Sequence, residues 1–153
     1  MRVTRLVLHN FRNYETADVD LPSGIVVFEG ANGQGKTNLV EAIAFLGSLK
    51  SHRVSQDAAL VRFGCSQAIV RAELGHGQRR LPIDVEINKS GTNRARVHDS
   101  VVKARELPRF FTSVIFAPED LSLVRGDPSG RRAFLDDLLA IHSPRFAETC
   151  LLY

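Results

Sequence analysis

The sequence lacks the features that would place the protein in a membrane or a secretory pathway. No apolar run approaches the roughly 18 residues of a membrane-spanning helix, and the N-terminus has no secretory apolar segment. Cysteine is scarce: Cys65 and Cys150 form no CxxC pair and have no histidine cluster beside them. This argues against a disulfide scaffold and against a zinc site. We expect a cytoplasmic protein with two buried, reduced thiols and no membrane contact.

The remaining composition is that of an ordinary globular protein. Hydrophobic residues make up 44% of the 153 residues and charged residues 24%, which suits one domain with a substantial core. The net charge of +3 permits nucleic-acid binding without requiring it.

A basic segment over residues 88–109 concentrates the positive charge. It holds six lysine and arginine residues and two acidic residues, a net charge of +4 in a chain of net charge +3. Such a local stripe indicates a polyanionic partner better than the total charge does. The alternative is a solvated basic face without a partner. The candidate DNA contacts in it are Lys89, Arg94, Arg96 and Lys103.

The chain is organised around a glycine-rich segment at residues 30–37. It satisfies G-x-x-x-x-G-K-[ST] at every fixed position, as Gly30, Ala31, Asn32, Gly33, Gln34, Gly35, Lys36 and Thr37. The apolar run at residues 25–28 is typical of a buried parallel strand. After the segment, apolar residues recur at helical spacing at Leu39, Ile43, Leu46 and Leu49. Strand, loop and helix are the context that a phosphate-binding loop requires.

The residue types of this segment suit a nucleoside triphosphate. Glycines let the backbone wrap closely around a polyphosphate with its N–H groups turned inward. The following helix adds free N–H donors and the positive end of its dipole. Lys36 can bring a positive charge to the β- and γ-phosphates, and Thr37 has the hydroxyl that usually holds Mg²⁺. We therefore expect ATP and Mg²⁺ as cofactors.

Other strands are predicted on both sides of the loop. Before it, residues 3–8 and 17–21 have strand patterns separated by a polar and aromatic loop at residues 9–14. Three strand patterns before the first helix favour a mixed sheet. After a short helix at residues 57–63, an antiparallel meander is expected, with strands at residues 67–74, 81–87 and 94–98. We interpret residues 65–103 as a β-subdomain packed against the nucleotide lobe.

The last third of the chain predicts a short strand followed by helices. Residues 113–116 form an apolar run, and Asp127-Pro128 is an N-terminal helix signature. A helix is expected to end near His142, and Ser143-Pro144 restarts one. The chain stops inside an apolar helical pattern, so it reads as cut short. The expected organisation is an ATP-binding lobe over residues 1–127 and the start of a helical region over residues 128–153.

Four segments resemble the RecF family of bacterial DNA replication and repair ATPases. They are LHNFRNY at 8–14, FEGANGQGKTNLVEAI at 28–43, FAPEDLSLVRG at 116–126 and PSGRRAFLD at 128–136. The resemblance implies an ATP-binding-cassette-type head of α/β fold, related to SMC proteins. It also implies a full-length protein that dimerises around ATP on single- or double-stranded DNA and works with other recombination mediators. The implied process is recombinational repair at gaps and stalled forks, within the response to DNA damage (SOS response).

The same resemblance assigns expected roles to single residues. Arg12 and Asn13 resemble loop residues that approach the nucleotide beside the glycine loop. Asn32 resembles the residue that faces the γ-phosphate and a partner head. Glu119 falls near the glutamine-loop position of related heads, although a glutamate stands there.

Two motifs of such an ATPase are missing from the sequence. There is no signature segment and no Walker B strand ending in acidic residues. Asp136-Asp137 follows a helical pattern rather than a strand, and Glu119-Asp120 lies behind Pro118. We expect a weak DNA-stimulated ATPase in the full-length protein and no activity in this chain alone. The resemblance places the missing motifs in the C-terminal part of the family's longer chains.

Arg131 and Arg132 conflict with their expected position. Both lie in the first turn of the helix after Pro128, where the helix dipole disfavours cations by about 0.3–1 kcal/mol each. A compensating anion is expected, either a carboxylate such as Asp136 or a DNA phosphate.

The function that we expect is an ATP-controlled clamp on DNA. One alternative is a small P-loop kinase of a metabolite, with the basic meander as its lid. Another is a fragment that binds nucleotide passively. Phosphate release with and without DNA would separate the three.

Overall fold

The structure is a computed structural model that describes residues 1–142. For residues 104, 105, 119, 122, 125, 137 and 140–142 it describes the backbone alone. The chain divides into two compact units, Met1–Val114 and Ile115–Tyr153. Each unit is considered by itself below.

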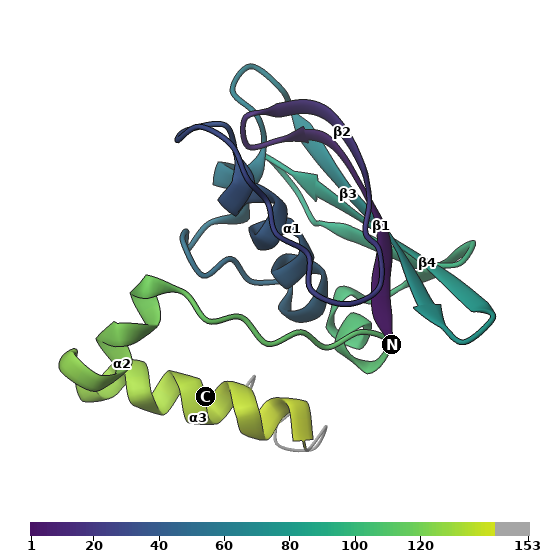
Figure 1. Cartoon of the computed structure of the whole chain (residues 1–153). Coiled ribbons are helices and arrows are strands. Elements are labelled where there is room, and N and C mark those ends of the chain that lie inside the picture. Colours follow the sequence, from purple (N-terminus) through teal and green to yellow (C-terminus); the bar gives the residue numbers. More distant parts are fainter. Residues whose placement is uncertain (143–153) are drawn as a thin grey trace. The chain divides into compact units, whose positions relative to one another are not determined.

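The first unit is a six-stranded sheet with one long helix against it (Figure 1). The strand order is β2-β1-β3-β4-β5-β6, and every neighbouring pair is antiparallel. The strands are β1 Arg2–Phe11, β2 Tyr14–Asp20, β3 Gln67–His76, β4 Arg79–Asn88, β5 Arg94–Val97 and β6 Ser100–Val102. The helices are α1 Lys36–Ser48 and the 3-10 helices η1 Asp57–Leu60 and η2 Ala104–Arg109.

Alternation along the strands gives the sheet one apolar face. In β3, Ala68, Val70, Ala72 and Leu74 are buried, and in β4 Ile83, Val85 and Ile87 are buried. Alternate residues of a strand point to opposite faces, so these side chains share the face that packs on α1. Phe45 and Leu46 of α1 complete that core and are fully buried. The predicted helix is confirmed.

The opposite face of the sheet is charged, and its charges are paired across strands. Arg5 donates to both carboxylate oxygens of Asp18, and Arg71 donates to both oxygens of Asp84. Arg80 bonds Glu73 at 2.7 Å. Such cross-strand pairs favour this register, although exposed ion pairs add at most about 1 kcal/mol each.

The meander is confirmed, but it is not separate from the first strands. β3 pairs with β1 over residues 69–75 and with β4 along its whole length, so the strands form one sheet. A short last strand, β6, was not predicted. The loop expected at residues 9–14 is mostly strand, because β1 continues to Phe11 and only Arg12 and Asn13 turn the chain into β2. The short helix at residues 57–63 is η1, which ends at Leu60.

The parallel strand predicted at residues 25–28 is not formed. The run has no regular secondary structure. Ile25 is 96% and Val27 79% exposed, while Phe28 packs against the core. A strand needs neighbours that accept and donate its backbone hydrogen bonds. Within residues 1–142 no strand pairs with this run. The strand predicted at residues 113–116 is absent in the same way, with Val114 98% exposed.

The second unit is helical over its described residues. It contains η3 Pro118–Leu121, α2 Ser122–Arg125 and α3 Pro128–His142. The helix after Asp127 is confirmed with its predicted start at Pro128, and it continues to His142, the last described residue. The helix restart at Ser143-Pro144 and the predicted buried thiol of Cys150 lie outside the described residues. Cys65 is a free thiol, as expected, but it is half-buried rather than buried. The domain boundary expected at residue 127 stays a prediction.

Candidate nucleotide-binding site

The glycine-rich segment forms a loop whose backbone depends on its glycines. Gly30, Gly33 and Gly35 have φ angles of 148°, 82° and 101°. Residues other than glycine rarely adopt such angles, which explains the two fixed glycines of the motif, Gly30 and Gly35, and the additional glycine at position 33. The loop ends where α1 begins, because the N–H groups of Asn38 and Leu39 both donate to the Gly35 carbonyl.

The tip of the β1–β2 hairpin packs directly on this loop. A methyl group at Gly35 would lie 2.6 Å from Asn13 Oδ1 and 2.9 Å from Tyr14 Cε2. Asn13 also donates from Nδ2 to the Gln34 carbonyl at 3.1 Å. The hairpin tip therefore supports the loop, and Asn13 lies beside it as the resemblance implies.

Lys36 reaches back across the loop. Its Nζ donates to the carbonyls of Gly30 at 2.6 Å and Ala31 at 2.7 Å. The ammonium group thus lies at the mouth of the loop, within reach of an anion that the loop N–H groups would bind. Thr37 follows in the first turn of α1 and is exposed. Ala31, Asn32, Gly33 and Gln34 are exposed along the loop.

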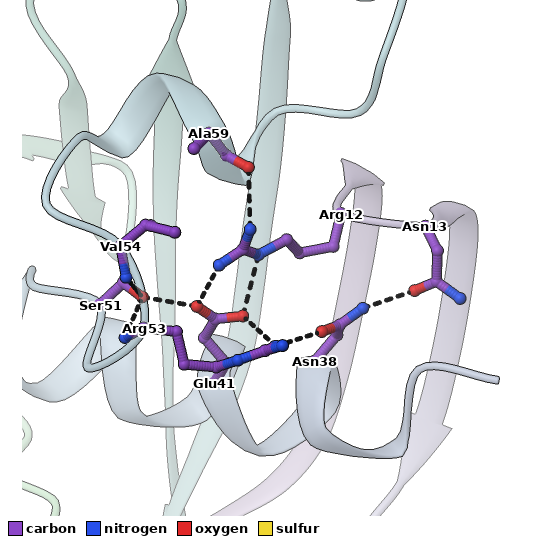
Figure 2. Close-up of polar contacts among 8 residues, drawn as sticks. All are labelled: Arg12, Asn13, Asn38, Glu41, Ser51, Arg53, Val54 and Ala59. Carbon is purple, nitrogen blue, oxygen red and sulfur yellow. Dashed lines mark hydrogen bonds and ion pairs between the residues drawn. The ribbon is translucent and has the colours of Figure 1, made fainter. Parts of the chain in front are cut away.

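A chain of polar side chains connects the loop with the middle of α1 (Figure 2). Asn38 donates from Nδ2 to Asn13 Oδ1 at 2.7 Å, and Arg53 donates to Asn38 Oδ1 at 2.9 Å. Arg53 also reaches Glu41 at 3.4 Å. The loop, the hairpin tip and the segment after α1 are therefore linked.

Glu41 is the centre of this network. Its side chain is fully buried, and Arg12 donates to both of its oxygens, at 2.9 Å and 2.6 Å. Ser51 donates to Oε1 at 2.5 Å. Burial alone would raise the pKa of Glu41, but the hydrogen bonds from Arg12 and Ser51 and the charges of Arg12 and Arg53 outweigh it. The pKa of Glu41 is therefore below its ordinary value.

Arg12 is held by protein groups at the hairpin tip, and its expected approach to the nucleotide stays a prediction. It turns the chain with a φ of 55°, and its guanidinium group points to Glu41 and to the Ala59 carbonyl, 3.1 Å from Nη1 (Figure 2). Its side chain is 17% exposed. Arg12 thus lies beside the loop, as the resemblance implies, but most of its donors are engaged by protein oxygens.

A pocket of about 490 Å³ opens beside the loop. One part of its wall is polar or cationic, from Arg12, Asn13, Asn38, Arg53 and Lys89. The other part is apolar, from Ala58, Ala59, Val61 and Phe63. Phe63 is 99% exposed, which leaves its ring free to contact a ligand. No acidic residue lines this pocket among the described residues.

The candidate DNA contacts do not form a single cluster. Lys89 lines the pocket, whereas Arg94 and Arg96 lie on the charged face of the sheet. In register, Arg94 lies opposite Glu86 and Arg96 opposite Asp84. Lys103 is exposed and precedes η2.

The second unit gives Arg131 partners that the sequence did not suggest. Its Nη1 donates to the carbonyls of Leu123 at 3.1 Å and Gly126 at 3.0 Å. Within the described residues, backbone carbonyls of the α2 segment rather than Asp136 thus offset this cation in the first turn of α3, and a contact of Arg131 with a DNA phosphate stays a prediction. Arg132 is exposed. The Glu119 side chain lies outside the described residues.

Asp120, Asp136 and Asp137 stand in sequence contexts similar to the end of a Walker B strand, but their surroundings differ. Asp120 accepts a hydrogen bond from the Ala117 N–H at 2.7 Å and so closes its own turn. Asp136 is exposed on α3, and the Asp137 side chain lies outside the described residues. Within the described part, no group of three histidine, cysteine or acidic residues could hold a metal ion. Thr37, the Mg²⁺ ligand expected from the sequence, stays a prediction.

Sequence reasoning missed Glu41, Asn38, Arg53 and Phe63. A signal existed for Glu41, because it stands inside the segment Leu39-Val40-Glu41-Ala42-Ile43 of a helix that is apolar on most sides. A charge at such a position needs a buried partner. The partners themselves come from segments far apart in sequence, so no local pattern identifies them.

The chain matches a known family over most of its length. The family described as RecF/RecN/SMC N terminal domain matches residues 2–129. Among curated proteins, the DNA replication and repair protein RecF of Clavibacter sepedonicus is 59% identical over 96% of this chain and 36% of its own length. The protein of the same name from Leifsonia xyli subsp. xyli is 52% identical over the whole chain and 40% of its own length. The chain thus spans about two fifths of these relatives.

Solved structures show the same fold. A structure described as the recombination mediator protein RecF-ATP in the RecFOR pathway matches with a TM-score of 0.91 and 28% identity, over 99% of this chain and 42% of that one. A structure from work on ATP-driven dimerization and DNA stimulated activation of SMC ATPases matches with a TM-score of 0.71 and 19% identity, over 89% of this chain and 98% of that one. The expected head fold is confirmed. In residues 1–142, no helix is long and apolar enough to cross a membrane.

Proposed function

Because the chain belongs to the RecF/RecN/SMC N-terminal domain family, we propose that it is the ATP-binding part of a RecF-like protein that acts as an ATP-controlled clamp on DNA. One observation carries the nucleotide assignment. The Lys36 ammonium lies across a loop of positive-φ glycines at the start of α1, which is the arrangement that binds polyphosphates.

The triphosphate occupies the loop in this proposal. Backbone N–H groups of residues 31–37 and the N-terminus of α1 bind its oxygens, and Lys36 exchanges its carbonyl partners for phosphate oxygens. Thr37 is exposed in the first turn of α1, and its hydroxyl is one ligand of Mg²⁺ in this proposal. Phosphate oxygens and water supply the other ligands, as this ion prefers. When bound, the ion neutralises charge on the phosphates.

The nucleoside extends into the pocket beside the hairpin tip. The apolar part of that wall suits a base, and the exposed ring of Phe63 gives it a surface to stack on. Arg53 and Lys89 are the cations at the polar part. Asn13 and Asn38 lie between the loop and this pocket, and we propose that their amides contact the sugar and the phosphates.

ATP then brings two heads together on DNA. Asn32 is exposed at the tip of the loop, where it can face a partner head. DNA meets the cations of the basic segment, with Arg132 as a further contact. The names of similar proteins support this proposal. The RecF relatives are described as DNA replication and repair proteins, and the similar SMC structure is described in terms of ATP-driven dimerization and DNA stimulated activation of SMC ATPases. Other recombination mediators as partners and a cytoplasmic location belong to the same proposal.

ATP binding is the first test of this function. A ligand that binds only the native state stabilises it by about 2.7 kcal/mol at a hundredfold excess over Kd. ATP with Mg²⁺ should therefore raise the melting temperature of the wild-type chain. Lys36→Ala removes the charge at the mouth of the loop and should lose most of that increase.

The matched control is Lys103→Ala, which removes an exposed lysine away from the loop. It should keep the full increase in melting temperature. Equal increases in the wild type and in Lys36→Ala would exclude the loop as the nucleotide site.

A further inference from the structure

Glu41 carries a charge that the fold has buried at a cost. Among the described residues it is the one buried charged side chain, and its exposed fraction is zero. A buried carboxylate without partners is strongly unfavourable. A helix that packs only against the core would have an apolar residue at this position, so the carboxylate needs another reason to be there.

The partners of Glu41 are two arginines from different parts of the chain. Arg12 comes from the hairpin tip and approaches both oxygens. Arg53 comes from the segment after α1 and approaches Oε2 at 3.4 Å. Ser51 bonds Oε1 through its hydroxyl, and that hydroxyl also accepts from the N–H groups of Arg53 and Val54 at 3.0 Å and 3.2 Å (Figure 2). Glu41 thus fixes the backbone around Arg53 as well as its side chain.

The cluster has one negative charge for two positive charges. Both arginines line the pocket beside the glycine loop, together with Lys89, and no acidic residue among the described residues does. The surplus charge therefore faces the pocket, where it favours an anion. Within the described residues Arg53 bonds Asn38 and Glu41 through Nη1, so its Nε and Nη2 donors are left for a ligand. Its side chain is 36% exposed, against 17% for Arg12.

We propose that Glu41 is a positioning residue of the nucleotide site: it holds Arg53 at the pocket wall so that the guanidinium group of Arg53 meets a nucleoside polyphosphate. This rests on the proposed nucleotide-binding function. Arg12 acts as the counter-ion that keeps the buried carboxylate ionised, and Arg53 presents donors to the ligand. Asn38, which accepts a hydrogen bond from Arg53, also donates to Asn13, and Asn13 donates to the Gln34 carbonyl. These contacts connect Arg53 to the glycine loop.

A double-mutant cycle on ATP affinity tests the proposal. The dissociation constant of ATP with Mg²⁺ is measured for the wild type, Glu41→Gln, Arg53→Gln and the double variant. Each single variant should bind ATP about tenfold more weakly, the effect of losing one charge-assisted hydrogen bond. Because Glu41 acts through Arg53, the double variant should be about as weak as either single variant. A hundredfold loss in the double variant, the product of two independent effects, would overturn the proposal.

Asp84→Asn is the matched control for removal of a carboxylate. Asp84 receives two hydrogen bonds from Arg71 on the charged face of the same sheet. This variant should bind ATP within twofold of the wild type. If it weakens ATP binding as much as Glu41→Gln does, general destabilisation explains both and the proposal fails.

Ser51→Ala keeps the test decisive if Glu41→Gln does not fold. It removes one donor to Glu41 and the acceptor of two backbone N–H groups, but leaves all charges in place. The Nε–H resonance of Arg53 is followed by NMR as a signature of a fixed guanidinium group. It should lose intensity in Ser51→Ala, with weaker ATP binding. An unchanged resonance and unchanged affinity would contradict the proposal, whereas a wild-type chain that does not bind ATP would contradict the proposed function instead.

Discussion

Gly35 is the glycine of the loop that the surrounding structure restricts most. It has a φ of 101°, and a Cβ there would meet Asn13 and Tyr14 at less than 3.0 Å. Gly33 has a φ of 82° but nothing within 4 Å of its added Cβ. The two positions therefore separate backbone strain from steric contact with the hairpin tip.

Gly35→Ala should destabilise the chain more than Gly33→Ala. Both variants bear backbone strain of about 1–2 kcal/mol, and Gly35→Ala adds overpacking of about 1–3 kcal/mol. Urea denaturation of the two variants gives the comparison. Equal losses of unfolding free energy in Gly35→Ala and Gly33→Ala would mean that close contact with the hairpin tip does not restrict position 35.

Glu41 predicts a specific dependence of stability on pH. Its pKa in the folded chain is lowered, so its ionised form stabilises the fold above the unfolded-state pKa of about 4.3. That contribution is lost as the pH falls through the folded-state pKa. Glu41→Gln should cost about 3 kcal/mol near pH 7, because it leaves a buried guanidinium group without its anion. The cost should shrink below about pH 4.

Asp18→Asn is the comparison for this pH effect. Its hydrogen bonds from Arg5 also lower the pKa of Asp18, but both partners are exposed on the sheet. Removing it should therefore cost little at any pH. Denaturation curves at a series of pH values measure both variants, and a pH-independent cost of Glu41→Gln would show that its charge is not what stabilises the fold.

At the scale of elements, the helices and strands with a clear periodic pattern were predictable from the sequence, but the pairing between distant strands was not. The helix at residues 36–48 and the meander follow from local alternation and spacing, which is why α1, β3, β4 and β5 were expected. The pairing of β3 with β1 joins residues 60 to 73 positions apart, from His9↔Ile69 to Arg2↔Gly75, and no local pattern encodes it. The runs at residues 25–28 and 113–116 have strand composition, but strand formation depends on a neighbouring strand, which the described part of the chain does not offer them.

The same limit applies to the site. The glycine loop was identified in full, because its spacing is local and its φ angles demand glycine. The pocket and the Glu41 network were not, since they join the hairpin tip, α1 and the segment around Arg53. Arg131 is the reverse case: the sequence showed that a cation needed compensation, but the compensating groups are backbone carbonyls, which no residue type reveals.

The basic segment gives a prediction at the scale of the sheet. If its cations contact phosphates, duplex DNA affinity should fall with salt by about 0.9 log units per contact and log unit of salt. Arg94→Gln combined with Lys103→Gln should then flatten the slope by about two units. Arg5→Gln combined with Arg80→Gln removes two cations outside the segment and should leave it unchanged. The test is DNA affinity measured over a range of salt concentrations. If the two double variants have equal slopes, the basic segment is a solvated face without DNA contacts.

At the scale of the whole molecule, the chain should bind ATP without hydrolysing it. Phosphoryl transfer to water needs the γ-phosphate charge neutralised and a group that places the water in line. Residues 30–37 supply much of the first requirement. For the second, the described residues offer no carboxylate in the pocket wall, Asp120 is engaged by its own turn, and the sequence has no signature segment to reach a partner's phosphates.

Steady-state phosphate release and light scattering with ATP, Mg²⁺ and duplex DNA should show no DNA-stimulated turnover and a monomer. Turnover abolished by Glu119→Gln or Asp137→Asn would identify a catalytic carboxylate in this chain, and an ATP-dependent dimer would show that these residues suffice for two heads to close.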